Sequence, residues 1–287
     1  MATSDEPIAR RLWQCLETLH AVTYFGARSH QAARDAGLKG FWMGYFGFRA
    51  APFGAVGSAV VEATFANFAP RMVARSVPDV WSFATPEELL VARRSAAADE
   101  LRAVVPEIES VAADTIDRVG AVIRAASSIG RPLFAANSAL DPVDDPVEQL
   151  WQHATSLREH RGDGHVATLL STGVDGCEAH LLHAAEHRTP HEVLQPNRGW
   201  TDDEWAAANE RLTERGLLAD GELAEAGREL RRDIEAETDR LAAGPFDRTL
   251  DDEDQTALLV ELTAPAQAVA ASGIIPFPNP MGLSAPT

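Results

Sequence analysis

The chain has 287 residues and 45% of them are hydrophobic, so it can bury a sizeable core in one large domain or two. Its net charge is −18, and the excess of acid lies after residue 100, because residues 1–100 carry ten acidic and ten basic side chains. An acidic field repels phosphate backbones, so the composition disfavours nucleic acid as a partner.

The cysteine content and the apolar segments indicate the cellular compartment in which the protein is expected. Only two cysteines are present, which gives neither a disulfide framework nor a cysteine metal cluster. Residues 1–11 are polar and charged, so no signal peptide is expected. The apolar run 41–61 contains Arg49 and Pro52, which favours a buried segment over a membrane span. We therefore expect a cytoplasmic protein with no membrane partner.

Helical periodicity and capping residues predict several helices before residue 140. The first spans Ile8–Phe25, with apolar side chains at the helical repeat, and ends at Gly26. Thr85-Pro-Glu-Glu88 is a clear helix start, with proline at the first helical position and acids in the first turn. The other predicted segments are a possible helix in Gly40–Gly54, a helix from Ser58 to about Phe68, helices from 85 to about 105 and from 106 to 128, and a linker at 140–146.

The second half has sharper boundaries. Asp175-Gly-Cys-Glu178 is a capping box that opens one helix, to about Arg188. Thr201-Asp-Asp-Glu204 opens the next helix, which ends at Gly216. Asp220-Gly221, between short apolar pairs, predicts a two-residue hairpin. The other predicted elements are helices 147–160, 164–172 and about 225–243, an acidic loop at 251–254, a last helix, and an apolar Pro-rich tail at 274–281.

The order helix, helix, helix, small hairpin, helix is that of a winged helix-turn-helix. The stretch Trp205–Arg240 resembles the recognition helix, wing and closing helix of MarR-type regulators. We predict a mainly α protein in three parts: a helical, aromatic-rich pocket domain (1–140), a winged-helix domain with a small β-hairpin wing (141–246), and an acidic loop, helix and Pro-rich tail that packs back on the body (247–287).

Four segments from both halves carry a wider resemblance. They are His20-Ala-Val-Thr-Tyr-Phe25, Gly40-Phe-Trp-Met-Gly-Tyr-Phe-Gly-Phe-Arg-Ala-Ala-Pro52, Asn67-Phe-Ala-Pro70 and Asn279-Pro-Met-Gly282. Together they resemble the SalK-like helix-turn-helix proteins of actinobacteria, nearly from end to end. The resemblance implies a winged-helix fold and no particular reaction.

Six aromatic side chains surround a single arginine, Arg49, in the segment Gly40–Gly54. A cation in apolar surroundings needs an internal carboxylate or an anionic ligand. A mostly apolar pocket with few polar groups is typical of a small-molecule site. The alternative is a core arginine paired with Glu62 or Glu17 and stacked on aromatic rings. The predicted ligand-contact residues are Trp42, Tyr45, Phe48, Arg49 and Asn67.

Glu17, His20 and Tyr24 share one face of the first helix, at i, i+3 and i+7. A carboxylate beside an imidazole can fix its tautomer and raise its basicity, which suits acid–base catalysis or metal binding. His20 is therefore the candidate acid–base residue, oriented by Glu17, with Tyr24 lining the site. The alternative is a histidine at the core edge, hydrogen-bonded to Glu17 or to a backbone carbonyl.

His183 and His187 lie at i and i+4 of a predicted helix, a spacing found in helical zinc sites. The sequence is not His-Glu-x-x-His, so solvated positions on an amphipathic helix are the alternative. No nucleotide-binding or nucleophile-elbow motif is present, and the cofactor stays open, with a His/Glu-bound metal as one option.

From these patterns we predict a homodimeric small-molecule-binding protein, in the first place an enzyme of secondary or peripheral metabolism that acts on an anionic molecule in a buried aromatic pocket. The predicted recognition helix, Thr201–Arg215, carries five acidic residues and two arginines, which is the opposite of what a DNA reader needs. The alternatives are a ligand-responsive winged-helix transcriptional regulator and a metal-binding protein.

Overall fold

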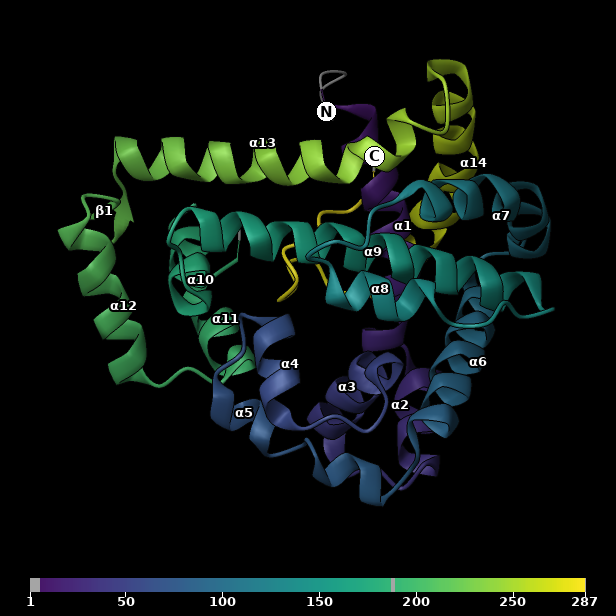
Figure 1. The fold of residues 1–287 in the computed structure, drawn as a ribbon, viewed down its shortest axis with the longest axis horizontal. Helices are drawn as coiled ribbons and strands as arrows, with labels where there is room; N and C mark the ends of the chain where they lie inside the picture. Colours follow the sequence, from purple (N-terminus) through teal and green to yellow (C-terminus); the bar gives the residue numbers. More distant parts are fainter. Residues whose placement is uncertain (1–5, 187–188, 287) are drawn as a thin grey trace.

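The computed structural model describes residues 6–186 and 189–286. Within this part of the chain, fourteen α-helices and one two-stranded antiparallel hairpin form the framework (Figure 1). The predicted fold class, mainly α with a winged helix-turn-helix and a small hairpin, is confirmed. None of the helices in the described ranges combines the length and apolar character needed to cross a membrane.

In the described part of the first half, from residue 6 on, there are eight α-helices. The predicted first helix is confirmed, and it ends where Gly26 turns the backbone into an extended conformation. The aromatic segment is helical as far as Ala50 and continues into a short 3-10 turn at Ala51–Phe53. The helices are α1 (Ile8–Phe25), α2 (Ala27–Asp35), α3 (Gly40–Ala50), α4 (Ser58–Phe65), α5 (Pro70–Ala74), α6 (Pro86–Val104), α7 (Ile108–Ala125) and α8 (Pro132–Ser138), with a second 3-10 turn at Asp79–Ser82.

The second half contains six helices and the hairpin. The two helices predicted in 147–172 are a single helix, because burial against its neighbours outweighs the weak helix propensity of Gly162 and Gly164. The predicted capping box at Asp175 forms, and a second capping box is present at Thr201. The elements are α9 (Pro146–Ser171), α10 (Gly176–Ala185), α11 (His191–Arg198), α12 (Asp202–Glu214), β1 (Leu218–Ala219), β2 (Glu222–Leu223), α13 (Glu225–Asp247) and α14 (Asp252–Ala271).

Helix α9 is the centre of the molecule. It packs against α1, α6, α7, α8 and α13, and α13 runs alongside it (Figure 1). Trp151 of α9 is 1% exposed and belongs to the largest apolar cluster, which also joins α1 to α14. The buried face is partly polar, with side chains at the helical repeat: Gln149, Gln152, Thr155, Ser156, Glu159, His160 and Asp163. A central helix of this kind holds a polar network inside the protein.

The winged-helix part is built from α10 to α13. Three residues, 199–201, turn α11 into α12, and Gly199 adopts φ +75°, a conformation that glycine reaches without strain. The predicted hairpin forms, with Asp220 and Gly221 both at positive φ between paired strands. Helix α12 packs on α10 and lies at the far side of the molecule from α6 and α7 (Figure 1). The division of the chain at residues 140 and 246 stays a prediction.

Candidate functional site

A cavity of about 260 Å³ lies where the first half, the winged-helix part and the C-terminal tail meet. Its walls come from α1, α3, α9, α10, α11 and α13, the segment 64–68 and the tail segment 280–284. Three carboxylates line it, Glu6, Glu17 and Glu235. The basic side chains are more numerous: Arg10, Arg49, Arg158, Arg161, Arg198 and Arg231. A cavity with this lining is suited to an anionic molecule.

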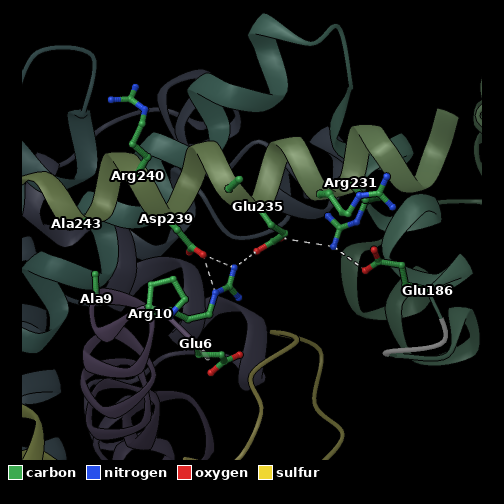
Figure 2. Close-up of a pocket in the computed structure, with 12 residues that line it drawn as sticks. Glu6, Ala9, Arg10, Glu186, Arg231, Glu235, Asp239, Arg240 and Ala243 are labelled. Carbon is green, nitrogen blue, oxygen red and sulfur yellow. Dashed lines mark hydrogen bonds and ion pairs between the residues drawn. The ribbon is translucent and has the colours of Figure 1, made fainter. Parts of the chain in front are cut away.

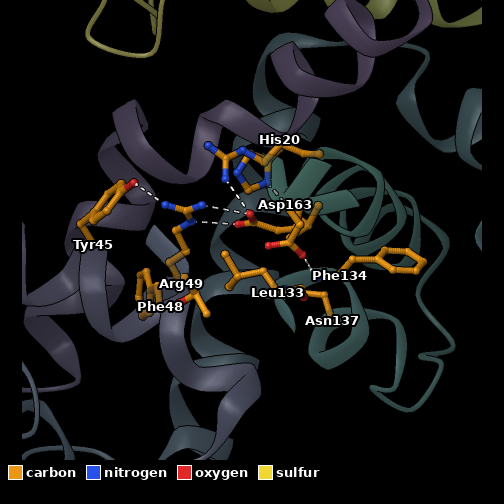
Figure 3. A network of polar contacts seen from close by, with 12 residues as sticks. His20, Tyr45, Phe48, Arg49, Leu133, Phe134, Asn137 and Asp163 are labelled. Carbon is orange, nitrogen blue, oxygen red and sulfur yellow. Dashed lines mark hydrogen bonds and ion pairs between the residues drawn. The ribbon is translucent and has the colours of Figure 1, made fainter. Parts of the chain in front are cut away.

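Arg49 is held by an internal carboxylate, that of Glu159 in α9. Its Nε and Nη2 donate to the two oxygens of Glu159 at 2.9 and 3.0 Å, and Nη1 donates to the Tyr45 hydroxyl at 3.2 Å (Figure 3). The guanidinium also stacks on Phe65, 4.1 Å from the ring centre. The sequence interpretation of a paired, aromatic-stacked arginine thus describes the geometry, although the partner is neither Glu62 nor Glu17.

Arg158 links this pair to α1. It donates to Glu159 at 2.8 Å and to Glu17 at 3.2 Å, and Trp13 donates to the second oxygen of Glu17. Burial alone would raise the pKa of the Glu159 carboxyl, but Arg158 and Arg49 lower it well below its usual range. Glu159 is therefore a buried anion between two arginines.

His20 is not oriented by Glu17, which corrects the expectation from their spacing. Its Nδ1 lies 2.9 Å from the Thr155 hydroxyl, while Glu17 is occupied by Arg158 and Trp13. Two side chains on one helical face meet only if their rotamers converge, and the arginine draws Glu17 away. Burial, with Arg158 nearby, lowers the pKa of His20 well below its usual range, so its ring is neutral. Its ring packs edge-on against Tyr24.

Arg198 is the least compensated charge in the cavity. It is 8% exposed, its guanidinium lies over the Phe68 ring, and its Nη groups donate to the backbone carbonyls of Asn197 and Pro280. No carboxylate of the described residues lies within ion-pair distance of it, and its Nε has no partner among them. Burial lowers the pKa of Arg198 to about 10. An uncompensated buried cation is costly, and an anionic ligand would relieve that cost.

The turn of the helix-turn-helix is fastened to the first half of the chain. The Ala69 amide donates to the Arg198 carbonyl at 2.9 Å, and the Trp200 indole donates to the Asn67 carbonyl at 3.3 Å. His180 of α10 donates to the same Asn67 carbonyl at 3.2 Å. Residues 67–69 therefore bind α10, the end of α11 and the turn before α12 at once.

A series of ion pairs connects α13 to α1 and to Glu186, next to the cavity. Arg10 of α1 contacts Asp239 at 2.7 Å and Glu235 at 2.9 Å, and Arg231 contacts Glu186 at 3.0 Å (Figure 2). Burial would raise the pKa of Glu235, but Arg161, Arg231 and Arg10 lower it to about 2. The charges of Arg10 and Arg231 are thus already matched by carboxylates, in contrast to that of Arg198.

Behind Glu159, Asp163 is a second buried carboxyl of α9. It accepts the Phe134 amide at 2.8 Å (Figure 3). Burial raises its pKa to about 7, against the lowering effect of that hydrogen bond. Asp163 consequently gains its charge near neutral pH, whereas Glu159 is ionised throughout.

The predicted ligand-contact residues take three different positions. Tyr45, Arg49 and Asn67 line the arginine cavity. Phe48 faces a smaller cavity beside α2. Trp42 lies in the aromatic cluster with Tyr45 and Phe68 and lines neither cavity. The side chain of Asn67 makes no hydrogen bond of its own to the site, and its carbonyl is the group that matters structurally.

The predicted metal site is only partly within the described residues. His187 lies outside them. His183 lines the cavity, with Nε2 3.2 Å from the Thr189 hydroxyl. Among the described residues, no group of three or more His, Cys, Asp or Glu side chains is arranged to hold a metal ion. The metal site at His183 and His187 therefore stays a prediction.

Sequence reasoning missed Arg158, Glu159 and Arg198. The first two could have been found, because polar residues recur every three or four positions along α9 and so mark a buried polar face. Arg198 has no such pattern, since an arginine in the last turn of a helix is ordinary. Its significance comes from the tail carbonyl of Pro280, 82 positions away.

Comparison with curated proteins and with solved structures finds no significant match. A family described as a helix-turn-helix family matches residues 9–276, which is nearly the whole chain.

This match overturns the expectation, drawn from net charge, that nucleic acid is a disfavoured partner, because a helix-turn-helix family suggests DNA binding. A count of acidic and basic residues, over the chain or along α12, does not give the electrostatic field at the surface, because paired charges largely cancel. Glu204 caps the start of α12 and pairs with Arg71 at 2.7 Å, so its charge is already balanced. The chain belongs to this helix-turn-helix family.

Proposed function

We propose that the protein is a winged-helix transcriptional regulator whose DNA affinity is controlled by an anionic small molecule in the arginine cavity. The observation that carries this proposal is the position of Arg198. It is a buried arginine without a carboxylate partner among the described residues, and it is the last residue of α11, directly before the turn into α12.

The winged-helix geometry supports the DNA-binding half of the proposal. Helix α12 follows a three-residue turn and precedes the hairpin, which is the place of a recognition helix before its wing. Its two arginines are engaged with α10: Arg211 contacts Asp175 and Glu178, and Arg215 contacts Glu178. We therefore expect α12 to supply few phosphate contacts and the complex to depend only weakly on salt.

The contacts of Arg198 support the regulatory half. An anion bound by its guanidinium competes with the carbonyl of Pro280 and pulls on the end of α11. The turn is fastened to residues 67–69, so a shift there moves α12 relative to the first half. Linkage then requires DNA and ligand to change each other's affinity by the same factor. Arg49, Tyr45 and Asn67 would line the bound ligand, and we assign His20, Glu17 and Tyr24 no catalytic role in this cavity.

The relation to SalK-like and MarR-type proteins is part of this proposal, as is a homodimer. A dimer would present two copies of α12 to a two-fold symmetric DNA site. Light scattering of the purified protein measures its mass directly, and a monomer at micromolar concentration would remove the dimer from the proposal.

The test is a binding titration with DNA from the region upstream of the protein's own coding sequence, at low salt, against a scrambled duplex. Fluorescence anisotropy is read with and without a panel of anions: benzoate, citrate and inorganic phosphate. We expect specific binding that one class of anion changes at least fivefold. Arg198→Met should keep DNA binding and lose the response, while Arg240→Met, which removes an exposed arginine of α13, keeps both. If the protein binds the upstream DNA no more tightly than the scrambled duplex, the proposal that it is a transcriptional regulator is refuted.

A further inference from the structure

A second cavity, of about 220 Å³, lies between α1, α2 and α3. Its walls are mainly apolar and include Ala33, Leu38, Phe41 and Phe48. Phe41 is 44% exposed and stands at the rim, whereas Phe48 is buried at 4%. Tyr45 lines both this cavity and the arginine cavity. The two cavities are therefore neighbours with opposite chemistry.

Three hydroxyl groups in the wall of this second cavity have no hydrogen-bond partner among the described residues: Thr23 Oγ1, Tyr24 OH and Ser29 Oγ. All three residues are buried, at 7%, 6% and 1% exposure. Buried polar groups almost always find a partner, because leaving one unpaired is costly. Three unpaired hydroxyls around one cavity therefore point to a molecule that pairs with them.

Thr23 lacks the side-chain hydrogen bond to the backbone that other helical threonines of this protein make. Thr18, Thr115 and Thr155 each donate to the carbonyl four residues earlier, at 2.7 to 2.9 Å. Thr23 lies in the same helix as Thr18 and makes no such bond. The hydroxyl of Thr23 and that of Ser29, at the start of α2, therefore remain unpaired in the wall of the cavity.

Among the described residues, the lining of the second cavity offers no unpaired charge to a ligand. Burial raises the pKa of Tyr24 well above its usual value, so its hydroxyl keeps its proton. The two basic residues of the lining are already engaged: His30 donates to the Tyr24 carbonyl at 2.8 Å, and the exposed Arg34 donates to Gln31. A charged ligand would lose its hydration here without gaining a counter-ion.

We propose that this second cavity binds a neutral one- or two-ring molecule that carries an oxygen able to hydrogen-bond, such as a phenol, a ketone or a lactone. The rings of Phe41 and Phe48 contact its apolar body, and the hydroxyls of Thr23, Tyr24 and Ser29 contact its oxygen. A cavity of about 150 Å³ is enough for benzene, so this one accommodates a bicyclic or substituted ring. The site does not depend on the protein's binding to DNA.

The experiment compares two probes of nearly equal size, 2-naphthol and the anion 2-naphthoate, by calorimetry on the full chain. We expect 2-naphthol to bind with one-to-one stoichiometry. Removing a hydroxyl without changing the shape, as in Thr23→Val, should weaken binding about fivefold. Thr23→Val should also raise the melting temperature of the free protein, because it removes an unpaired buried group. Ser29→Ala should weaken binding in the same direction.

Thr115→Val is the matched control. Its hydroxyl is buried and already bonded to the Val111 carbonyl in α7, so the substitution should lower the melting temperature and leave 2-naphthol affinity unchanged. The proposal is overturned by any of three outcomes: no saturable binding of 2-naphthol, equal binding of 2-naphthoate that Arg198→Met abolishes, or unchanged 2-naphthol affinity in Thr23→Val and Ser29→Ala. The second outcome would assign the ligand to the arginine cavity.

Discussion

Replacing Glu159 with glutamine removes the anion that two buried arginines share. The side chain of Glu159 is 1% exposed, and it accepts three hydrogen bonds, two from Arg49 and one from Arg158. After Glu159→Gln, Arg158 keeps Glu17 as a counter-charge, whereas Arg49 is left with uncharged acceptors, the new amide oxygen and the Tyr45 hydroxyl. The variant therefore leaves one arginine buried without a counter-charge.

Breaking a buried pair from one side costs about 3 to 5 kcal/mol. Arg49→Met should cost less, about 1 to 2 kcal/mol, because Glu159 still has Arg158. The double variant removes the stranded cation as well, so it should be more stable than Glu159→Gln alone by about 2 kcal/mol. At about 2.1 cal/mol/K per residue, unfolding 287 residues changes entropy by about 0.6 kcal/mol/K. Glu159→Gln should thus lower the Tm by about 5 to 8 °C.

The assay is differential scanning calorimetry of the four proteins in one buffer, with far-UV circular dichroism to establish that all are folded. The order expected for Tm is wild type, Arg49→Met, double variant, Glu159→Gln, with the last two clearly separated. The reasoning is refuted if the losses of the two single variants simply add in the double variant. Additive losses would mean that Arg49 finds another counter-charge once Glu159 is neutral.

Two further predictions concern Asp163 and the glycines of α13. The raised pKa of Asp163 means that the folded state holds its proton more tightly than the unfolded state, so this group's contribution to stability falls as pH rises from about 4 to 7. Asp163→Asn should remove that loss, and the stability of the variant relative to wild type should increase by about 2.5 kcal/mol between pH 5 and pH 8; a flat difference would mean that Asp163 stays ionised. A Cβ at Gly227 would clash with the Leu217 carbonyl, whereas at Gly244 it would meet the flexible end of Arg248. Gly227→Ala should therefore destabilise the protein by more than about 2 kcal/mol, and Gly244→Ala should stabilise it by about 0.5 to 1 kcal/mol, as chemical denaturation can measure; equal effects would show that the wing moves to make room.

Local features of the fold could be predicted because their causes are local. The boundary of α1 follows from Gly26, and the starts of α6, α10 and α12 follow from capping residues three positions apart. The hairpin follows from Asp220-Gly221 in the same way. By contrast, the sequence pattern predicts two helices in place of α9, with a break near its glycines. The packing that keeps α9 a single helix involves five other helices, which the local pattern does not show.

The candidate site was harder to predict, because its contacts are distant in sequence. Arg49 could be identified as a buried cation from its aromatic neighbours, but its partner Glu159 lies 110 positions away. Spacing placed Glu17 beside His20, yet the preference of Glu17 for Arg158 depends on the approach of α9. The acidic composition of α12 was misleading in part because the counter-charge of Glu204, Arg71, comes from another segment.

The tail after α14 has a consequence for the order in which the protein is made. Residues 280–282 and 284 form one wall of the arginine cavity, and the Pro280 carbonyl holds Arg198. The ribosome adds this wall 82 residues after Arg198, once every helix of the winged part has been translated. A nascent chain can thus fold α12 before the arginine cavity is complete. If the cavity binds the proposed anion, only molecules whose synthesis has passed residue 284 can bind it fully.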